Sequence, residues 1–266
     1  MSGREGLVCD NVGNYEVVLA DGSIVNANRT ENRDLWIALK GGSSNFEIAT
    51  RFNIRTFQQG DFNGGVIVSP KSTVDTQFEG YVNLDPYAAL IMSVSWNQIR
   101  NSFSVFTNLQ YTKNDTSSAV LQPFIQALPQ YLDTMRVSNL TDFAKEASRY
   151  AAPGLRNQSA TTTFGEGLES LNTVYNIWNS SISAISSING TNWAMVTQPF
   201  PTAFVSSSTE ANSLGLSTSS NHQTLFLLSY SWASAEDDHE MTAAAQKLVN
   251  DIEAAVSKVG VANDFK

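Results

Sequence analysis

The order of strand-like and helical segments along residues 59–266 constrains the fold of this chain most. Runs of β-branched and aromatic residues predict strands at residues 65–69, 88–96, 103–112, 193–199 and 224–232. Helical periodicity lies between them, near residues 72–82, 117–128, 138–150, 167–187 and 236–259. Strands that follow one another and are then separated by helices indicate an antiparallel sheet with helices on one face. The sequence therefore predicts an α+β fold for this part of the chain.

The first 58 residues carry the signals of a smaller, β-rich unit. Residues 15–25 hold two β-rich runs on either side of Asp21-Gly22, a dipeptide typical of a tight hairpin turn. Asn32 can cap a short helix that Gly41 ends, and residues 46–57 alternate as a further strand. Because a turn-rich stretch follows, we expect a domain boundary there, with domains at residues 1–58 and 59–266.

Composition argues against several classes of protein. The chain has 266 residues and a net charge of −9, which opposes binding to the phosphate backbone of nucleic acids. No apolar run reaches the ~18 residues that a membrane-spanning helix needs. Cys9 is the one cysteine, so neither a disulfide within the chain nor a cysteine zinc site is possible.

One acidic cluster, Asp237-Asp-His-Glu, has the composition of a metal site. Neighbouring residues on a helix point in different directions, and acidic residues in a first turn stabilise the positive end of the helix. We therefore interpret the cluster as the start of the last helix and expect no metal site. Neither a Gly-x-Ser-x-Gly elbow nor a phosphate-loop motif is present.

Three stretches of sequence together resemble a known family. The first is Gly6-Leu-Val-Cys-Asp-Asn-Val with Glu16-Val-Val-Leu-Ala-Asp-Gly. The second is Asn32-Arg-Asp-Leu-Trp-Ile-Ala-Leu-Lys-Gly-Gly-Ser-Ser-Asn-Phe-Glu-Ile-Ala-Thr-Arg-Phe. The third is Asn212-Ser-Leu-Gly-Leu, followed by Tyr230-Ser-Trp and the helix start at Asp237-Asp238. In this order and spacing they are similar to fungal berberine-bridge-type FAD-linked oxidases of the PCMH (vanillyl-alcohol oxidase) superfamily.

The resemblance implies the cofactor FAD and two functional domains. Residues 1–58 would be the later part of a PCMH-type FAD-binding domain, and residues 59–266 a substrate-binding α+β domain. In the family, a glycine-rich pyrophosphate loop and the residues that bond the flavin precede the position of Met1, and a closing strand and helix follow that of Lys266. We expect both parts to be absent from this chain. Cys9 aligns after the flavinylated cysteine, so covalent attachment is not assigned to it.

The resemblance also implies cofactor contacts. Val18 resembles the residue whose backbone meets the adenine end of the flavin cofactor. Asn11 and Val12 are expected beside that position.

Substrate contacts are expected on the predicted sheet, at Gln198 and Trp96. Along residues 88–96, alternate residues share a face. The face with Ser93 and Ser95 is smaller and more polar than the face with Trp96, so it is the expected pocket wall. No catalytic residue is assigned.

Two departures from the family pattern fall in the second stretch. The family usually reads Gly-Gly-Gly-Asn-Phe-Gly, whereas this chain has Ser43 and Ser44 at two glycine positions and Glu47 at the last. Glycine permits positive φ and close backbone approach, and glutamate adds bulk and charge. Either the backbone here is ordinary or the cofactor no longer approaches it, and we expect a relaxed constraint.

The resemblance favours an enzyme, an FAD-linked oxidoreductase that acts on a small natural product. Two alternatives stay open: a flavin-free isomerase or pericyclic cyclase on the same scaffold, and an inactive fragment. Expected partners are a small-molecule substrate and, through apolar strand edges at residues 7–57, another copy of the chain. The family is often secreted but no leader is visible, so the sequence leaves the compartment open.

Overall fold

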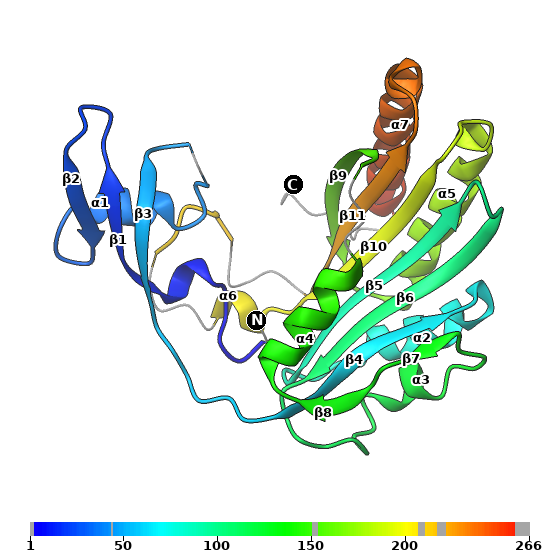
Figure 1. The fold of residues 1–266 in the computed structure, drawn as a ribbon, viewed down its shortest axis with the longest axis horizontal. Coiled ribbons are helices and arrows are strands. Elements are labelled where there is room, and N and C mark those ends of the chain that lie inside the picture. Colours follow the sequence, from blue (N-terminus) through cyan, green and yellow to red (C-terminus); the bar gives the residue numbers. More distant parts are fainter. Residues whose placement is uncertain (1–2, 44, 151–153, 207–210, 217–221, 259–266) are drawn as a thin grey trace. The chain divides into compact units, whose positions relative to one another are not determined.

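The computed structural model describes residues 3–43, 45–150, 154–206, 211–216 and 222–258. The chain forms two compact units (Figure 1). Unit 1 combines Met1–Gln59 with Pro201–Ser220, and unit 2 combines Gly60–Phe200 with Asn221–Lys266. Each unit is therefore built from two separate parts of the sequence. The assignment of one unit to a cofactor and of the other to a substrate stays a prediction.

Unit 1 contains a three-stranded antiparallel sheet in the order β2-β1-β3. The strands are β1 (Val12–Val18), β2 (Ile24–Asn28) and β3 (Ile48–Ile54), a 3-10 turn (Cys9–Asn11) precedes them, and the short α6 (Ala203–Ser206) belongs to the same unit. β1 and β2 form the hairpin predicted at Asp21-Gly22. Gly22 takes a φ of 84° there, which explains why the turn needs glycine.

Helix α1 (Arg33–Leu39) packs on this sheet and completes a small core. The buried residues of that core are Val12, Tyr15, Val17, Ala27, Trp36 and Leu39. The indole N–H of Trp36 donates to the Val12 carbonyl at 3.0 Å. The predicted cap at Asn32 is wrong in its chemistry, because the Asn32 amide donates to the Asn26 carbonyl at 2.8 Å and makes no bond to the helix. Gly41 follows the end of the helix, as predicted.

Unit 2 is built on an eight-stranded antiparallel sheet. The main strand order is β7-β4-β6-β5-β10-β11-β9, and β8 pairs with β4. The long strands are β4 (Phe62–Ser69), β5 (Ala88–Asn97), β6 (Ser102–Tyr111), β9 (Arg156–Gly165), β10 (Asn192–Phe200) and β11 (Gln223–Trp232). The short strands are β7 (Leu132–Asp133) and β8 (Arg136–Ser138). The predicted antiparallel sheet is confirmed.

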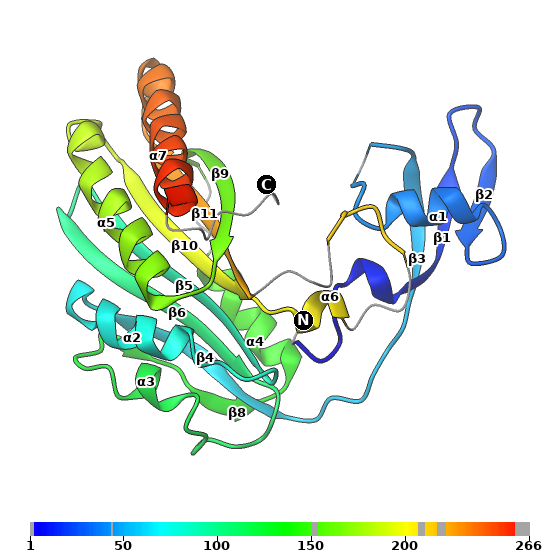
Figure 2. The same ribbon diagram turned by 180° about the vertical axis from the view of Figure 1, so that it is seen from behind.

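Four helices cover one face of this sheet (Figure 2). They are α2 (Val74–Tyr81), α3 (Gln122–Ile125), α5 (Leu168–Ile185) and α7 (Asp238–Lys258), with 3-10 turns at Lys71–Thr73 and Ala235–Asp237 before α2 and α7. Their apolar side chains form one core with the strands. α4 (Leu140–Ala147), followed by a 3-10 turn (Ser148–Tyr150), lies against the other face, where Phe143 packs on Phe62 of β4. Among the described residues, no helix has the length and apolar character to cross a membrane.

Several elements differ from their sequence predictions, since the short β7, β8 and α6 were not predicted and two larger differences concern β9 and α3. β9 was not predicted, since it reads Arg-Asn-Gln-Ser-Ala-Thr-Thr-Thr-Phe-Gly and lacks the apolar alternation of a half-buried strand. Its backbone nevertheless pairs with β11 along its whole length. The helix predicted over residues 117–128 is reduced to α3, because Pro123 sits in its first turn and can begin a helix but not continue one.

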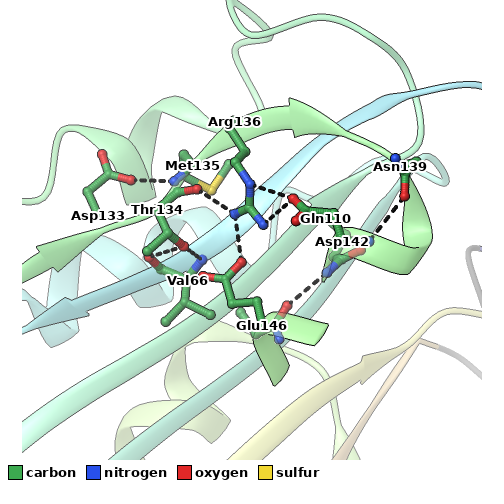
Figure 3. A network of polar contacts seen from close by, with 10 residues as sticks. Val66, Gln110, Asp133, Thr134, Met135, Arg136, Asn139, Asp142 and Glu146 are labelled. Carbon is green, nitrogen blue, oxygen red and sulfur yellow. Dashed lines mark hydrogen bonds and ion pairs between the residues drawn. The ribbon is translucent and has the colours of Figure 1, made fainter. Parts of the chain in front are cut away.

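Ion pairs between Arg136 and two acidic residues of α4 hold this helix against β8 (Figure 3). The guanidinium of Arg136 on β8 donates through Nε to the Asp142 carboxylate at 2.9 Å and through Nη1 to the Glu146 carboxylate at 2.6 Å. It also lies 4.6 Å from the centroid of the Phe143 ring. Burial would raise the pKa of Glu146, but hydrogen bonds from Thr134 and Arg136 outweigh that effect and lower it. Glu146 is 8% exposed, so its charge depends on Arg136.

Replacing Arg136 with methionine should destabilise unit 2 by about 1–3 kcal/mol, because Glu146 would keep a buried charge without its partner. Urea unfolding followed by tryptophan fluorescence measures this loss. Lys145→Met, on the exposed side of the same helix, is the matched control and should change the unfolding free energy by less than about 0.5 kcal/mol. Adding Glu146→Gln to Arg136→Met should recover part of the loss, and no recovery would show that lost packing is responsible instead of charge.

A second acid of unit 2, Glu166, is partly buried, and its pKa is shifted in the opposite direction. Glu166 directly follows β9, and its backbone N–H donates to the His222 carbonyl at 2.9 Å. Burial raises the pKa of its carboxyl to about 7. The pKa of the fully buried Tyr81 is also raised, first by burial and further by the nearby charge of Glu166. The folded chain therefore holds the Glu166 proton at pH values where the unfolded chain has already released it.

Stability should consequently fall as the pH rises from the ordinary glutamate pKa of 4.5 to about 7, and the loss should be complete above that pH. Glu166→Gln removes this dependence. Between pH 4.5 and pH 8 the variant should gain about 1–2 kcal/mol of unfolding free energy relative to the parent, less than the full shift because the carboxyl is partly exposed. Urea unfolding at several pH values measures the gap. Glu79→Gln, exposed on α2, is the control, and a gap independent of pH would contradict the prediction.

Candidate functional site

The first two stretches that carry the family resemblance and the Asn212–Leu216 part of the third meet in unit 1, whereas Tyr230-Ser-Trp belongs to β11 of unit 2. The Asn212 amide donates to the Asp10 carboxylate at 2.9 Å. The backbone N–H of Ser213 donates to the Lys40 carbonyl at 2.9 Å, and its hydroxyl donates to the Ala38 carbonyl at 3.0 Å. Segments that are far apart in the sequence are thus joined in one group, which we call the motif cluster (Asp10, Lys40, Asn212 and Ser213).

A lysine side chain is buried in the motif cluster. Lys40 is 0% exposed, and its Nζ lies 3.6 Å from the centroid of the Trp36 ring. Within the described structure, neither this Nζ nor the Oδ2 of Asp10 has a hydrogen-bond partner. Burial lowers the pKa of Lys40, and the charge of Asp10 opposes that shift. The cation is held by an aromatic face and a neighbouring carboxylate.

Cys9 lies beside this cluster and is half-buried. Burial raises the pKa of its thiol, and the charge of Asp10 raises it further. Because the thiolate is the reactive form of cysteine, a raised pKa makes this side chain less reactive at neutral pH.

An open recess with a volume of about 470 Å³ adjoins the motif cluster. Its lining consists of Asp10, Asn11, Val12, Gly13, Arg29, Trp36, Lys40, Asn53, Ile54 and Arg55. Asn11 organises one side of it, since its amide donates to the carbonyls of Glu5 and Leu7 at 2.8 Å and its Oδ1 accepts from Nε of Arg55 at 2.9 Å. Three cationic side chains and one carboxylate line the recess in a chain with a net charge of −9.

The residues predicted to contact the cofactor do not all lie together. Asn11 and Val12 line the recess at the start of β1. Val18 is the last residue of the same strand, so it lies about 20 Å from Val12 at the rise of an extended chain. The expectation that Asn11 and Val12 lie beside Val18 is therefore wrong, because the strand separates them.

Val18 belongs instead to a row of aliphatic side chains at the hairpin end of the sheet. It pairs with Ile24 of β2 and with Ile48 of β3, and directly paired residues share a face. Ile24 is 68% exposed and Ile48 is 70% exposed. We call this row the aliphatic platform (Val18, Ile24 and Ile48). An exposed apolar surface of this kind suits a flat ring of a ligand.

The turn after α1 is sterically constrained. Gly41 has a φ of 107°, and a Cβ at this position would lie 2.5 Å from Cγ of Leu214. Ser43 takes a φ of 55°, in the left-handed region that glycine favours. Of the two alternatives for this stretch, an ordinary backbone is wrong at Ser43. Ser44 lies outside the described residues.

Glu47, the other departure from the family pattern, is partly exposed. Its charge can therefore remain in contact with water, and the substitution needs no buried partner.

One face of five strands in unit 2 carries no ionisable side chain. The strands β6, β5, β10, β11 and β9 are described throughout, and their register puts alternate residues on the face opposite α2, α3, α5 and α7. The residues on that face are Ser102, Ser104, Phe106, Asn108, Gln110, Ala89, Ile91, Ser93, Ser95, Asn97, Asn192, Ala194, Val196, Gln198, Phe200, Gln223, Leu225, Leu227, Ser229, Ser231, Asn157, Ser159, Thr161, Thr163 and Gly165. We call this surface the open face. It offers hydroxyls, amides and apolar carbons, and over these five strands no acid, base, phenol or thiol.

The two residues predicted to contact the substrate lie on different faces of the sheet. Gln198 is on the open face and partly exposed, together with Ser93 and Ser95 of the predicted polar wall. Trp96 is on the helix-covered face, 4% exposed within the core, and its indole N–H donates to Asn101 at 3.4 Å. A ligand on the open face would therefore reach Gln198 and not Trp96.

Sequence reasoning missed the cations of the recess. Arg29, Lys40 and Arg55 belong to no common motif, and Lys40 alone falls within a stretch of the family resemblance. The register of β1 against β2 and β3 brings the chain near Arg29 and the chain near Arg55 to the same end of the sheet. That register could not be deduced from spacing along the sequence.

The acidic cluster at the start of α7 has structural contacts. Asp238 accepts from the indole N–H of Trp232 at 2.9 Å and pairs with Arg156. The hydroxyl of Ser234 accepts from the Glu236 N–H at 3.2 Å and so caps the preceding turn. In the described part of the chain, no group of three or more His, Cys, Asp or Glu side chains could hold a metal ion.

Ser43→Gly should stabilise unit 1 by about 0.5–1 kcal/mol, because it relieves the cost of a left-handed backbone at a residue with a Cβ. Thermal or urea unfolding measures the gain. Ser102→Gly, at an extended position on β6, is the control and should be destabilising, since glycine only adds unfolded-state entropy there. A loss of stability in Ser43→Gly would show that the serine side chain makes a compensating contact.

Comparison with known proteins connects these features to a family. No family model matches the chain. It is 33% identical over 286 residues to the FAD-dependent monooxygenase elcE of Phaeosphaeria nodorum, covering 99% of this chain and 85% of that protein. It is 33% identical over 283 residues to the FAD-dependent monooxygenase CTB5 of Cercospora beticola, covering 53% of it. It also matches 22% of the Oligopeptidase PhomG' of Diaporthe leptostromiformis at 32% identity over 265 residues.

Solved structures show the same fold at low sequence identity. The 6-hydroxy-D-nicotine oxidase of Arthrobacter nicotinovorans superposes with a TM-score of 0.71 at 14% identity, over 98% of this chain and 57% of that one. The glucooligosaccharide oxidase of Acremonium strictum gives 0.70 at 17% identity, over 96% of this chain and 56% of that one. The chain thus spans little more than half of these structures and of the Cercospora protein. With the Phaeosphaeria protein matched over most of its length, the chain belongs to the fungal FAD-dependent monooxygenases and has the fold of berberine-bridge-type oxidases.

Proposed function

We propose that this chain serves an FAD-linked oxidoreductase that acts on a small natural product. The observation that carries the proposal is the membership of the family of FAD-dependent monooxygenases, over nearly the whole chain. In such a reaction FAD supplies the redox chemistry, taking a hydride from the substrate and passing electrons to oxygen. The protein supplies binding and position, and the two units divide these tasks.

We propose that unit 1 contacts the cofactor. The aliphatic platform fits the flat adenine ring, because Val18 lies between two isoleucines that are each more than two-thirds exposed. Asn11 and Val12 stand at the other end of β1 and would meet a different part of an extended dinucleotide. Their fixed hydrogen bonds position the recess and leave the Val18 end for the ring.

We propose that the open face of unit 2 contacts the substrate, with Gln198 among the contacts. Its hydroxyl and amide groups suit an uncharged ligand with hydroxyl or carbonyl oxygens, and its aliphatic and aromatic residues suit a ring system. Two proteins of the same fold are a xylooligosaccharide oxidase solved with xylobiose, a neutral sugar, and a carbohydrate oxidase solved with a substrate analogue. A charged ligand would lack a counter-ion on these five strands.

We further propose that another polypeptide segment or a second copy of the chain covers β3. This strand is at the edge of its sheet, and Ile48, Phe52 and Ile54 are 70%, 53% and 47% exposed. Apolar side chains on an open strand edge favour pairing with further protein. An oligomer or a larger assembly would protect this edge.

The proposed cofactor contact is tested by titrating the purified chain with FAD and recording flavin absorption after desalting. The parent should retain the flavin bands, and Ile48→Asp should weaken binding about tenfold, because a charge would replace the apolar surface under the ring.

Ile99→Asp is the matched control, since Ile99 is 74% exposed and belongs to unit 2, whereas the platform belongs to unit 1. It should bind FAD like the parent. A folded parent that retains no flavin would contradict the proposal and favour a flavin-free isomerase or cyclase. Equal binding by Ile48→Asp would move the cofactor contact away from the platform.

A further inference from the structure

The recess of unit 1 has a chemistry that the proposed adenine and substrate contacts do not use. Its cationic side chains come from three elements: Arg29 follows β2, Lys40 follows α1 and Arg55 follows β3. We infer that this recess binds the phosphate group of a small phosphorylated molecule.

Arg55 is positioned before any ligand arrives. Its Nε donates to Oδ1 of Asn11 at 2.9 Å and its Nη2 to the Glu5 carboxylate at 3.1 Å. Asn11 is itself fixed by two bonds to backbone carbonyls. A guanidinium held in this way directs its remaining N–H groups with little loss of side-chain entropy on binding.

Lys40 adds a positive charge at the base of the recess. Its Nζ is buried against the Trp36 ring, and among the described residues it has no hydrogen-bond partner. Water has already been removed from this ammonium during folding, so an approaching anion would not have to displace it. Burial lowers the pKa of Lys40 most, and repulsion from the charge of Arg29 lowers it further. An anion between them would relieve that repulsion.

Asp10 is the one carboxylate of the lining, and it opposes an anion. Its Oδ1 already accepts from Asn212, which reduces its influence on the recess. With Glu5, which pairs with Arg55, three cations stand against two carboxylates and leave an excess of one positive charge. This excess stands out in a chain with a net charge of −9.

The charge and the size of the recess favour phosphate over a simple carboxylate. A phosphate group has enough oxygens to accept from a guanidinium fork and from other cations at once. The volume of about 470 Å³ also leaves room for the organic part of a nucleotide-sized molecule. The pyrophosphate of a flavin cofactor and the phosphate of a separate metabolite share this chemistry. Inorganic phosphate alone can report the site, so the inference does not require the proposed function.

The test is to titrate the purified chain separately with inorganic phosphate, AMP and FAD at constant ionic strength. The melting temperature and phosphorus NMR report the binding. Arg29→Gln and Lys40→Met should each weaken phosphate binding about tenfold. Arg33→Gln, an exposed arginine on α1 outside the recess, should bind like the parent. Because Arg29 is exposed, Arg29→Gln should fold. If Lys40→Met does not fold, phosphate binding by Arg29→Gln tests the inference by itself.

Absence of phosphate binding by the parent, or equal binding by all four proteins, would overturn the inference. Competition between FAD and phosphate, with weaker FAD binding by Arg29→Gln, would identify the cofactor as the source of the phosphate. Simultaneous binding of FAD and phosphate would support a separate metabolite. Phosphate binding without any FAD binding would uphold the site and refute the proposed function.

Discussion

The architecture of unit 1 depends on the contacts of one chain segment, Pro201–Ser220, which is distant in sequence from the rest of the unit. β10 and β11 are neighbours in the sheet of unit 2, yet the connection between them runs through Pro201–Ser220, which belongs to unit 1. Among its described residues, Asn212 bonds to Asp10, and Ser213 bonds to the carbonyls of Lys40 and Ala38. The close approach of Leu214 to Gly41 completes the attachment and explains why a side chain is not tolerated at that glycine.

The apolar core of unit 1 is small. Among the described residues it consists of six buried apolar side chains, and a core of that size contributes modest stability by itself. The buried Lys40 and the orphaned oxygen of Asp10 add polar groups without hydrogen bonds to a small interior. A ligand in the recess, or protein over β3, would therefore affect the stability of unit 1 more than that of unit 2, whose core spans a large sheet and four helices.

Local signals in the sequence were sufficient where the structure follows local rules. The Asp21-Gly22 turn predicted the hairpin, and periodic apolar residues predicted the long helix α7. Local signals did not predict β9, because its polar residues form a strand only by pairing with β11, a distant segment of the chain. The recess could not be predicted for a related reason, since the register of the strands in unit 1 brings its cationic residues together. The family resemblance predicted a cofactor contact at Val18 and gave no reason to separate it from Asn11, whereas the length of β1 separates the two residues.

The neutral character of the open face has a consequence for acid–base chemistry. A side chain that accepts a proton during a reaction must have a pKa within reach of the working pH, and hydroxyls and amides of Ser, Thr, Asn and Gln do not. A substrate held against these five strands could be oriented by them but could not lose a proton to them. The dependence of its turnover on pH would then report the ionisation of the substrate, of the cofactor or of residues beyond the sheet. This face of the five strands would then orient the substrate equally well over the whole pH range in which the sheet stays folded.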